Sequence, residues 1–386
     1  MKKEAVQINV LHVLNDGCKA SLVLFLPSLA KEFAISLTKV GFLASAVNSL
    51  EILLALPASH LATKIGGKKI LLGTVFFWAA GFLLLGIAQN YLLIIPAFII
   101  AGIGFGSFHP VAFALVSRMF EKGTRGKQLG NFTALGDLGR VGLASLVTVV
   151  IVYIGWRYAS ILISLLLFII GFYFLHVSKK EIPMIEEKES TEVISYKNMM
   201  KNKNFLLSSL SFCMDSLASS SLFVFIPFLL LQRHVPYVFL GVLTSTFFIG
   251  NMFGKVVLGR LVDMFGNTRV FVISEILMAI FIIILSNSTW LPLIIISSVI
   301  LGVFTKGTVP VLTTMVSESF EHQKGIEKAF GLNALFVGIA TTTAPFLLGF
   351  LSDTFGIATA FHFSAGFALV ATIPALLLER AHKGIS

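Results

Sequence analysis

The feature that most constrains this chain is a series of twelve apolar stretches, each long enough to cross a lipid bilayer as a helix. A spanning helix needs about 20 predominantly apolar residues. Short polar segments separate most of the stretches, so consecutive helices are expected to run antiparallel. The predicted spans are residues 7–31, 38–60, 69–89, 92–118, 128–153, 156–178, 205–231, 238–262, 269–287, 290–318, 328–351 and 357–379.

The composition excludes a soluble protein. Hydrophobic residues make up 56% of the chain and charged residues only 12%, whereas a soluble domain is about 25% charged. The net charge of +10 would suggest nucleic-acid binding in a soluble chain, but here the basic residues fall in short connecting segments. Asn15 and Asp16 interrupt the first apolar stretch, which predicts a retained helix and not a cleaved signal peptide. Cys18 and Cys213 form no disulfide or metal-binding pattern.

The distribution of Lys and Arg predicts the orientation. One side of the membrane receives 21 of them and the other side four, Lys31, Lys39, Arg157 and Arg233. Basic residues concentrate in cytoplasmic loops. We therefore expect a multi-pass protein of the cytoplasmic (inner) membrane with both termini in the cytoplasm.

An internal repeat divides the chain into two halves. Residues 179–204 are polar, carry both charge signs and lack an apolar period, which predicts a cytoplasmic linker between six-helix bundles at 1–178 and 205–386. Parallel six-helix repeats are typical of secondary transporters whose site lies near the bilayer midplane between the halves. At an offset of 200 residues the identical pairs include Pro27 with Pro227, Gly66 with Gly266, Gly102 with Gly302, and Pro110 with Pro310.

Ionisable residues inside the predicted spans are the candidates for function. Each costs roughly 2.5–3.5 kcal/mol at the bilayer centre on insertion scales. The four acids and four bases within the spans suggest pairing. The candidates for substrate or proton binding are Asp16, Lys19, Glu51, His109, Asp137, Arg140, Asp215 and Lys306. Of the ionisable residues in the spans, His12, His109 and Lys255 lie further toward the cytoplasm.

Two of these candidates have an alternative structural interpretation. Asp16 either binds a proton or substrate, or forms a fixed ion pair with Lys19 one turn away. His109 precedes Pro110, where a helix can kink and free a carbonyl group, but a single histidine is also commonly a packing residue.

The stretch "GDLGRVGL" at 136–143 places Asp137 and Arg140 three residues apart on one helix face, where each lowers the other's cost of burial. We expect a charge pair at the seam between the halves, with either a structural role or a role in substrate binding or gating. The spacing of Gly136, Gly139 and Gly142 predicts close approach of a neighbouring helix.

Other classes of chemistry leave no signature. The sequence contains no G-x-x-x-x-G-K-[ST] motif for ATP and no H-E-x-x-H or Cys/His metal spacing. We expect no enzyme activity, no cofactor and no metal, so the energy must come from an ion gradient. One charge moving through 100 mV supplies about 2.3 kcal/mol, which supports a roughly 50-fold substrate gradient.

Two loops resemble a gating motif of the major facilitator superfamily. "GRLVDMFGNTR" after the eighth span is similar to the family's G-x-L-x-D-R/K-x-G-R/K pattern, although Met264 replaces a basic residue, and "SHLATKIGGKK" after the second span is a degenerate copy. The resemblance implies the major facilitator fold, an all-α protein with twelve helices in two pseudo-symmetric bundles. The gating-loop candidates are Lys64, Gly66, Gly259, Asp263 and Gly266.

Two further motifs resemble the fosmidomycin-resistance-like branch of this superfamily. "HVLNDG" at 12–17 and "GSFHPVAFALVSRM" at 106–119 are similar to its first-helix and fourth-helix signatures. The resemblance implies proton-driven export of small drugs or metabolites, and a cavity lined by helices 1, 4, 7 and 10. Arg140 stands where many superfamily exporters have a proline, which weakens the antiporter interpretation.

The leading prediction is therefore a proton-coupled exporter of a small organic molecule, acting as a monomer in the bilayer, with no nucleic-acid partner. The alternative is proton-coupled uptake of a small anion or zwitterion, favoured by Lys19, Arg140 and Lys306. A membrane sensor that has lost transport is disfavoured, because the longest polar stretch is only the 179–204 linker.

Overall fold

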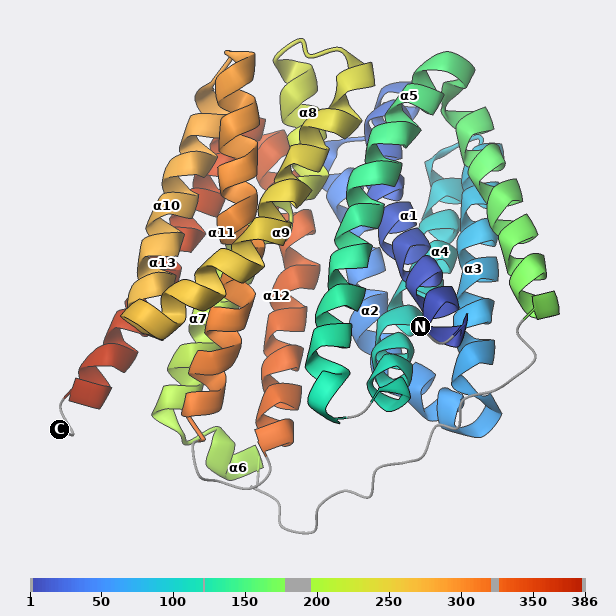
Figure 1. Ribbon diagram of the computed structural model, residues 1–386. Helices are drawn as coiled ribbons and strands as arrows, with labels where there is room; N and C mark the ends of the chain where they lie inside the picture. The colour runs from blue at the N-terminus through green and yellow to red at the C-terminus, as the bar shows by residue number, and fades with distance from the viewer. Residues whose placement is uncertain (1–2, 121, 178–195, 321–325, 384–386) are drawn as a thin grey trace. The chain divides into compact units, whose positions relative to one another are not determined.

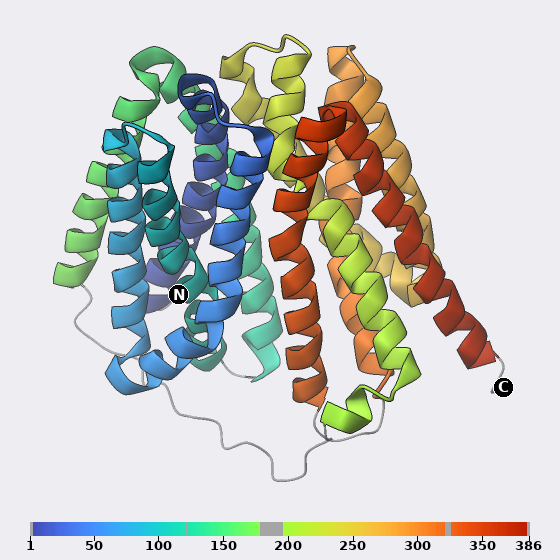
Figure 2. The same cartoon turned by 180° about the vertical axis from the view of Figure 1, so that it is seen from behind.

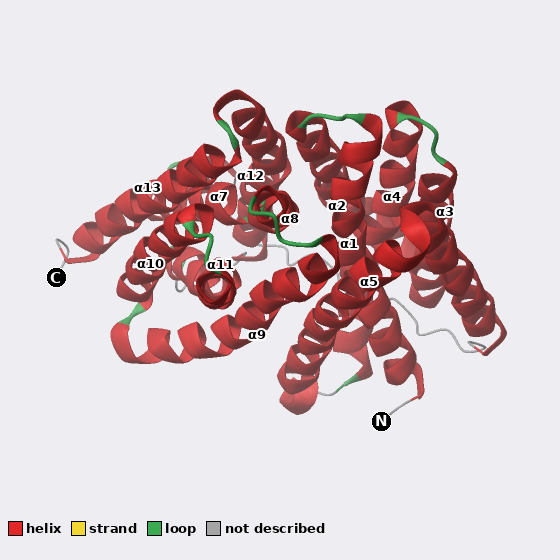
Figure 3. Cartoon of the chain, turned by 90° about the horizontal axis from the view of Figure 1, so that it is seen from above, coloured by secondary structure: helices red, strands yellow, loops and turns green. Residues whose placement is uncertain are grey.

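The structure is a computed structural model that describes residues 3–120, 122–177, 196–320 and 326–383. Every regular element in these ranges is a helix, and short loops join them (Figure 3). The first elements are α1 (Lys3–Phe33), α2 (Leu37–Ile65), α3 (Gly67–Ile87), α4 (Tyr91–Met119) and α5 (Lys122–Val177). They are followed by α6 (Tyr196–Met199), α7 (Lys203–Ser219), α8 (Leu222–Gln232), η1 (Tyr237–Phe239), α9 (Leu240–Phe265), α10 (Asn267–Asn287), α11 (Leu291–Glu318), α12 (Ile326–Phe355) and α13 (Ile357–Lys383).

The helices confirm the predicted series of membrane spans. Within the described residues, 11 apolar helical stretches are long enough to cross a membrane. The longest of them, 128–177, contains two of the predicted spans, because Gly155 at φ 79° breaks the helical path of α5. In Figure 1, α5 accordingly rises, turns over near its middle and descends as a second helix. Helices α7 and α8 together form the stretch Lys203–Gln232.

The repeat is visible in the backbone. Helices α3 and α10 begin and end at an offset of 200 residues. The glycines that precede them, Gly66 and Gly266, have φ values of 103° and 82°. These left-handed conformations favour glycine, which explains why both repeats keep it. The same offset relates Ala34 and His234, which have φ values of 48° and 59°.

The chain divides into two compact units. The first unit comprises Met1–Glu187 with Val235–Ser245, and the second comprises Lys188–His234 with Thr246–Ser386. The predicted linker at 179–204 lies largely outside the described residues, so the predicted domain boundaries stay a prediction.

Each unit has its own apolar interior. In the first unit, α3 packs on α4, and Trp78 stacks on Phe105 with ring centroids 5.9 Å apart. In the second unit, α10 packs on α11 and α13, and Phe271, Leu312 and Ala371 belong to one buried cluster. Figure 2 shows α7 between α12 and α13 in this unit. These buried faces position the polar side chains described next.

Candidate functional site

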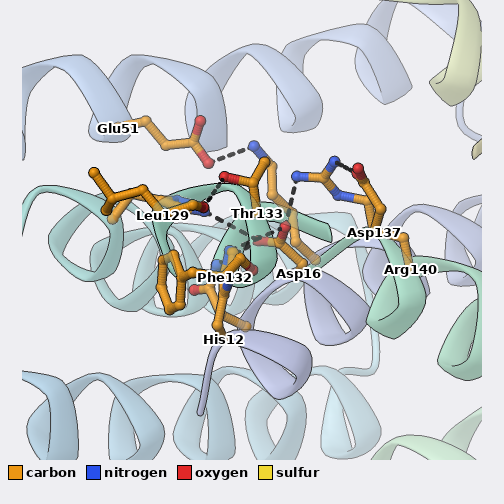
Figure 4. Close-up of polar contacts among 11 residues, drawn as sticks. His12, Asp16, Glu51, Leu129, Phe132, Thr133, Asp137 and Arg140 are labelled. Carbon is orange, nitrogen blue, oxygen red and sulfur yellow. Dashed lines mark hydrogen bonds and ion pairs between the residues drawn. The ribbon is translucent and has the colours of Figure 1, made fainter. Parts of the chain in front are cut away.

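Asp16 is the centre of a buried polar network in the first unit (Figure 4). It lies on α1 and its residue is only 2% exposed. Its Oδ2 atom lies 2.7 Å from an Arg140 guanidinium nitrogen of α5, and its Oδ1 atom lies 3.2 Å from Nε2 of His109 of α4. The Asn15 side-chain amide donates to Oδ1 over 2.8 Å. Three helices therefore direct polar groups at one carboxylate.

His12 adds a fourth group and lies one helical turn before Asp16. Its Nδ1 donates a hydrogen bond to the backbone oxygen of Phe132, 2.8 Å away, because a carbonyl oxygen can only accept. This bond leaves Nε2 facing Asp16 Oδ2 at 3.4 Å. The imidazole ring is stacked between Phe132 and Phe108, at centroid distances of 3.9 and 5.8 Å. The ring orientation is thus fixed by packing and by one hydrogen bond.

Arg140 joins two buried carboxylates. One guanidinium nitrogen lies 2.7 Å from Asp16 Oδ2 and the other donates to Asp137 Oδ1, also over 2.7 Å. Asp137 is 1% exposed, whereas the Arg140 side chain is 26% exposed. The predicted Asp137–Arg140 ion pair is confirmed. The contact between Arg140 and Asp16 was not predicted.

Lys19 does not pair with Asp16, and that structural alternative is wrong. Its ammonium group instead forms an ion pair and hydrogen bond with Glu51 of α2. Both side chains are 31% exposed. Glu51 also interacts electrostatically with Arg140. The five predicted candidates Asp16, Lys19, Glu51, Asp137 and Arg140 thus belong to one charge network, and His109 reaches it from α4.

Glycine brings α1 and α5 close enough for these contacts. A Cβ atom on Gly139 would lie 2.2 Å from the backbone oxygen of Val13, and one on Gly136 would lie 2.5 Å from Asp16 Oδ2. The prediction of close approach is correct for these two residues. It is wrong for Gly142, whose Cβ would meet no atom within 4 Å, because that glycine faces away from α1.

His12, Asp16 and His109 also form a candidate metal-binding group, with ligand atoms all within 4.8 Å of one another. The same carboxylate already faces the positively charged Arg140, however, and repulsion between like charges opposes a divalent cation there.

The second unit contains the remaining predicted site residues. Asp215 of α7 is 2% exposed and accepts a hydrogen bond from the Thr308 hydroxyl of α11 over 3.0 Å. Lys306, on the same helix as Thr308, interacts electrostatically with Asp215. The carboxyl group of Glu275, on α10, is a further neighbour of Asp215. Glu275 was not among the predicted residues, although a carboxylate inside the 269–287 span is itself a signal of function.

The gating-loop candidates lie at equivalent helix junctions of the two units. Gly66 separates α2 from α3, and Gly266 separates α9 from α10, both with positive φ. Lys64 and Asp263 are exposed on the turns before these glycines, and a Cβ on Gly259 would meet no atom within 4 Å. The tight glycine turn is confirmed, whereas the latching role stays a prediction.

An all-helical membrane fold with charged side chains inside its helical units is the architecture of a secondary transporter. The family model of the Major Facilitator Superfamily matches residues 8–241 and 208–385. The chain therefore belongs to the major facilitator superfamily, and it is a multi-pass membrane transporter and not an enzyme. The assignment to the fosmidomycin-resistance-like branch stays a prediction.

Individual relatives agree with this family. The chain is 25% identical to the Haemophilus influenzae "Putative metabolite transport protein" over 81% of its own length and 78% of the relative's. It is 25% identical to the "Probable L-galactonate transporter" of Escherichia coli over 45% of this chain and 38% of that one. The Cupriavidus necator "Probable sulfoacetate transporter SauU" is also 25% identical, over 36% of this chain and 32% of the relative.

Solved structures share the fold at low sequence identity. A point mutant of the nucleoside transporter NupG superposes with a TM-score of 0.83 at 12% identity, over 97% of this chain and 99% of that one. An inward-facing, occupied bacterial homologue of the human lysosomal transporter Spinster gives a TM-score of 0.80 at 13% identity, over 97% and 96% of the two chains.

Proposed function

We propose that this chain is a proton-coupled transporter that exports a small organic molecule by alternating access. The observation that carries the proposal is the geometry between His12 and Asp16. With Nδ1 donating to Phe132, a neutral His12 presents the bare Nε2 to a carboxylate oxygen 3.4 Å away. Two acceptors that face each other repel, whereas one proton between them forms a hydrogen bond. The pair is therefore a site at which a proton is held.

Protonation of this pair is coupled to Arg140. When Asp16 is ionised, it binds the guanidinium group directly. A proton held by the pair cancels its net negative charge and weakens the attraction for Arg140, so the guanidinium group then relies mainly on its bond to Asp137. Arg140 is partly exposed and can turn to another anion. Proton binding and substrate binding thus compete through one arginine, which is the linkage that an antiporter requires.

A second candidate function is proton-coupled uptake of a small organic anion. Lys19 and Arg140 both keep more than a quarter of their side chains exposed, so cationic groups face the accessible part of the site. Two relatives are named for L-galactonate and sulfoacetate, which are anions at neutral pH. Both candidates place the protein in the cytoplasmic membrane with both termini in the cytoplasm, as a monomer. A sensor without transport activity is disfavoured by the intact charge network.

The direction of substrate movement under an imposed pH gradient separates the two functions. The purified protein is reconstituted into liposomes, and uptake of radiolabelled galactonate, sulfoacetate and fosmidomycin is measured. Antiport predicts accumulation when the lumen is more acidic than the outside, and symport predicts accumulation when the outside is more acidic. These predictions hold for either orientation of the protein. A probe that raises the thermal stability of the protein but accumulates under neither gradient would contradict proton coupling.

A further inference from the structure

The second unit contains two carboxyl groups buried against each other. Asp215 of α7 is 2% exposed and Glu275 of α10 is 0% exposed. Their side chains interact directly with each other. Both lie well inside their helices, twelve residues after the start of α7 and eight after the start of α10.

The two carboxyl groups have different surroundings. Asp215 accepts a hydrogen bond from the Thr308 hydroxyl and faces the charge of Lys306. Both Glu275 oxygens are buried, and no hydrogen-bond donor of the described residues reaches either of them. An ionised Glu275 would therefore have no compensating partner and would lie beside a second negative charge. Burial of an unpaired charge costs several kcal/mol, so such a group takes up a proton instead.

We propose that Glu275 holds one proton and shares it with ionised Asp215, which makes the pair a second protonation site of this transporter. An ionised carboxylate can only accept hydrogen bonds, whereas a protonated one has an O–H to donate. One proton on Glu275 therefore supplies the donor that the pair lacks and removes the repulsion between two like charges. The remaining charge of Asp215 is then balanced by Lys306.

The other acidic and basic side chains on α7, α10, α11, α12 and α13 lie toward the helix ends. Helices α7, α10, α11, α12 and α13 pack against one another around the pair. The buried residues in the middle of α13 include Ala365, Ala368 and Ala371, which carry no charge. The further ionisable groups of these helices with described side chains are the half-buried thiol of Cys213 on α7, and Lys203, Arg269, Glu318, Lys328, Asp353, His362, Glu379 and Arg380. Lys306 interacts electrostatically with Asp215, and α9, which packs against α11, adds Lys255 and Arg260.

A row of hydroxyl groups leads along α7 to the pair. Ser208, Ser211 and Ser219 are buried and recur at the three- to four-residue spacing that places them on the Asp215 face of the helix. Ser208 donates to the backbone oxygen of Met315 over 3.2 Å. Hydroxyl groups both donate and accept hydrogen bonds, so this row makes the Asp215 face of α7 polar. Helix α7 ends at Ser219, one turn beyond Asp215, where the path of the helix breaks before α8.

Infrared difference spectroscopy of the reconstituted full chain tests the proposal, because the C=O stretch of a protonated carboxyl group differs from that of a carboxylate. The parent protein is expected to show a protonated-carboxyl band at neutral pH that is lost at alkaline pH.

Glu275→Gln should lose this band and keep its thermal stability, since the amide can donate to Asp215 as the protonated acid does. Asp215→Asn should keep the band at a shifted frequency. Asp353→Asn, the same change at an exposed carboxylate, should match the parent.

Thermal stability as a function of pH gives a second readout. Removal of the proton at alkaline pH recreates two buried negative charges, so the parent should lose stability there and Glu275→Gln should not. An unchanged band in Glu275→Gln, or loss of the band in Asp215→Asn, would overturn the proposal, and so would identical alkaline stability profiles of the parent and Glu275→Gln.

The proposal extends the proton coupling proposed above. Because both measurements use no substrate and no gradient, failure of this pair is distinguishable from failure of proton-coupled transport.

Discussion

Replacing Arg140 by glutamine tests the charge network most severely. Arg140 is bonded to two carboxylates, Asp16 and Asp137, which are 2% and 1% exposed. Removal of one partner from a buried ion pair costs about 3–5 kcal/mol. For a unit of this size, 1 kcal/mol corresponds to about 2–4 °C in the melting temperature. We therefore expect Arg140→Gln to lower the melting temperature of the purified protein by roughly 6–20 °C.

The double variant separates the two contacts. If Asp137 were the sole partner, Asp137→Asn combined with Arg140→Gln would restore full stability. The structure predicts only partial recovery, because Asp16 keeps an uncompensated charge. A third change, Asp16→Asn, should restore most of the remainder. Asp137→Asn alone should cost less, about 1–3 kcal/mol, because Arg140 keeps its bond to Asp16.

The assay is thermal unfolding in detergent, followed for the parent and for the four variants. Arg380→Gln, the same substitution at a site near the end of α13, serves as the control and should fall within about 0.5 kcal/mol of the parent. The reasoning is refuted if Arg140→Gln is as stable as the parent. It is also refuted if the double variant recovers fully while Asp16 is unchanged.

Two further predictions concern orientation and helix packing. Cysteines placed at Lys3 and Gly384, in a background without the native cysteines, should resist a membrane-impermeant thiol reagent in intact cells; labelling of either would contradict the cytoplasmic location of the termini. Gly139→Ala should destabilise the protein by about 1–3 kcal/mol or more, because its Cβ would lie 2.2 Å from the Val13 backbone oxygen. Gly142→Ala, with no atom within 4 Å, should instead be neutral or stabilising by up to about 1 kcal/mol. Equal melting temperatures for the two alanine variants would rule out the proposed role of Gly139.

Local patterns in the sequence predicted those parts of the structure that depend on neighbouring residues. The apolar stretches predicted the spans, the offset of 200 predicted the equivalent glycine turns at Gly66 and Gly266, and the i,i+3 spacing predicted the Asp137–Arg140 pair. Each of these three features follows from the regular geometry of a single helix or of its ends, which is the same in every protein.

Contacts between helices were not predicted, because hydropathy fixes neither the rotation nor the tilt of a helix. In the sequence, the ion-pair partner considered for Asp16 was Lys19, one turn away on the same helix. In the structure, Asp16 instead forms its ion pair with Arg140 of α5, and Lys19 pairs with Glu51. Glu275 is a different case. The rule that a charge inside a span indicates function applies to it directly. With Glu275, the acids away from the span ends number five, against the four bases Lys19, Arg140, Lys255 and Lys306.

The central claim, proton coupling through Asp16, is tested most directly by transport driven by a pH gradient in liposomes that contain either the parent or Asp16→Asn. The probe is a compound that the parent accumulates under one gradient, and the control is Asp353→Asn. We expect Asp16→Asn to fold with a loss of stability like that of Asp137→Asn, about 1–3 kcal/mol, and to bind the probe, yet to show no accumulation under either gradient, whereas Asp353→Asn accumulates it normally. Accumulation by Asp16→Asn at the parental rate, with the parental dependence on pH, would contradict the account.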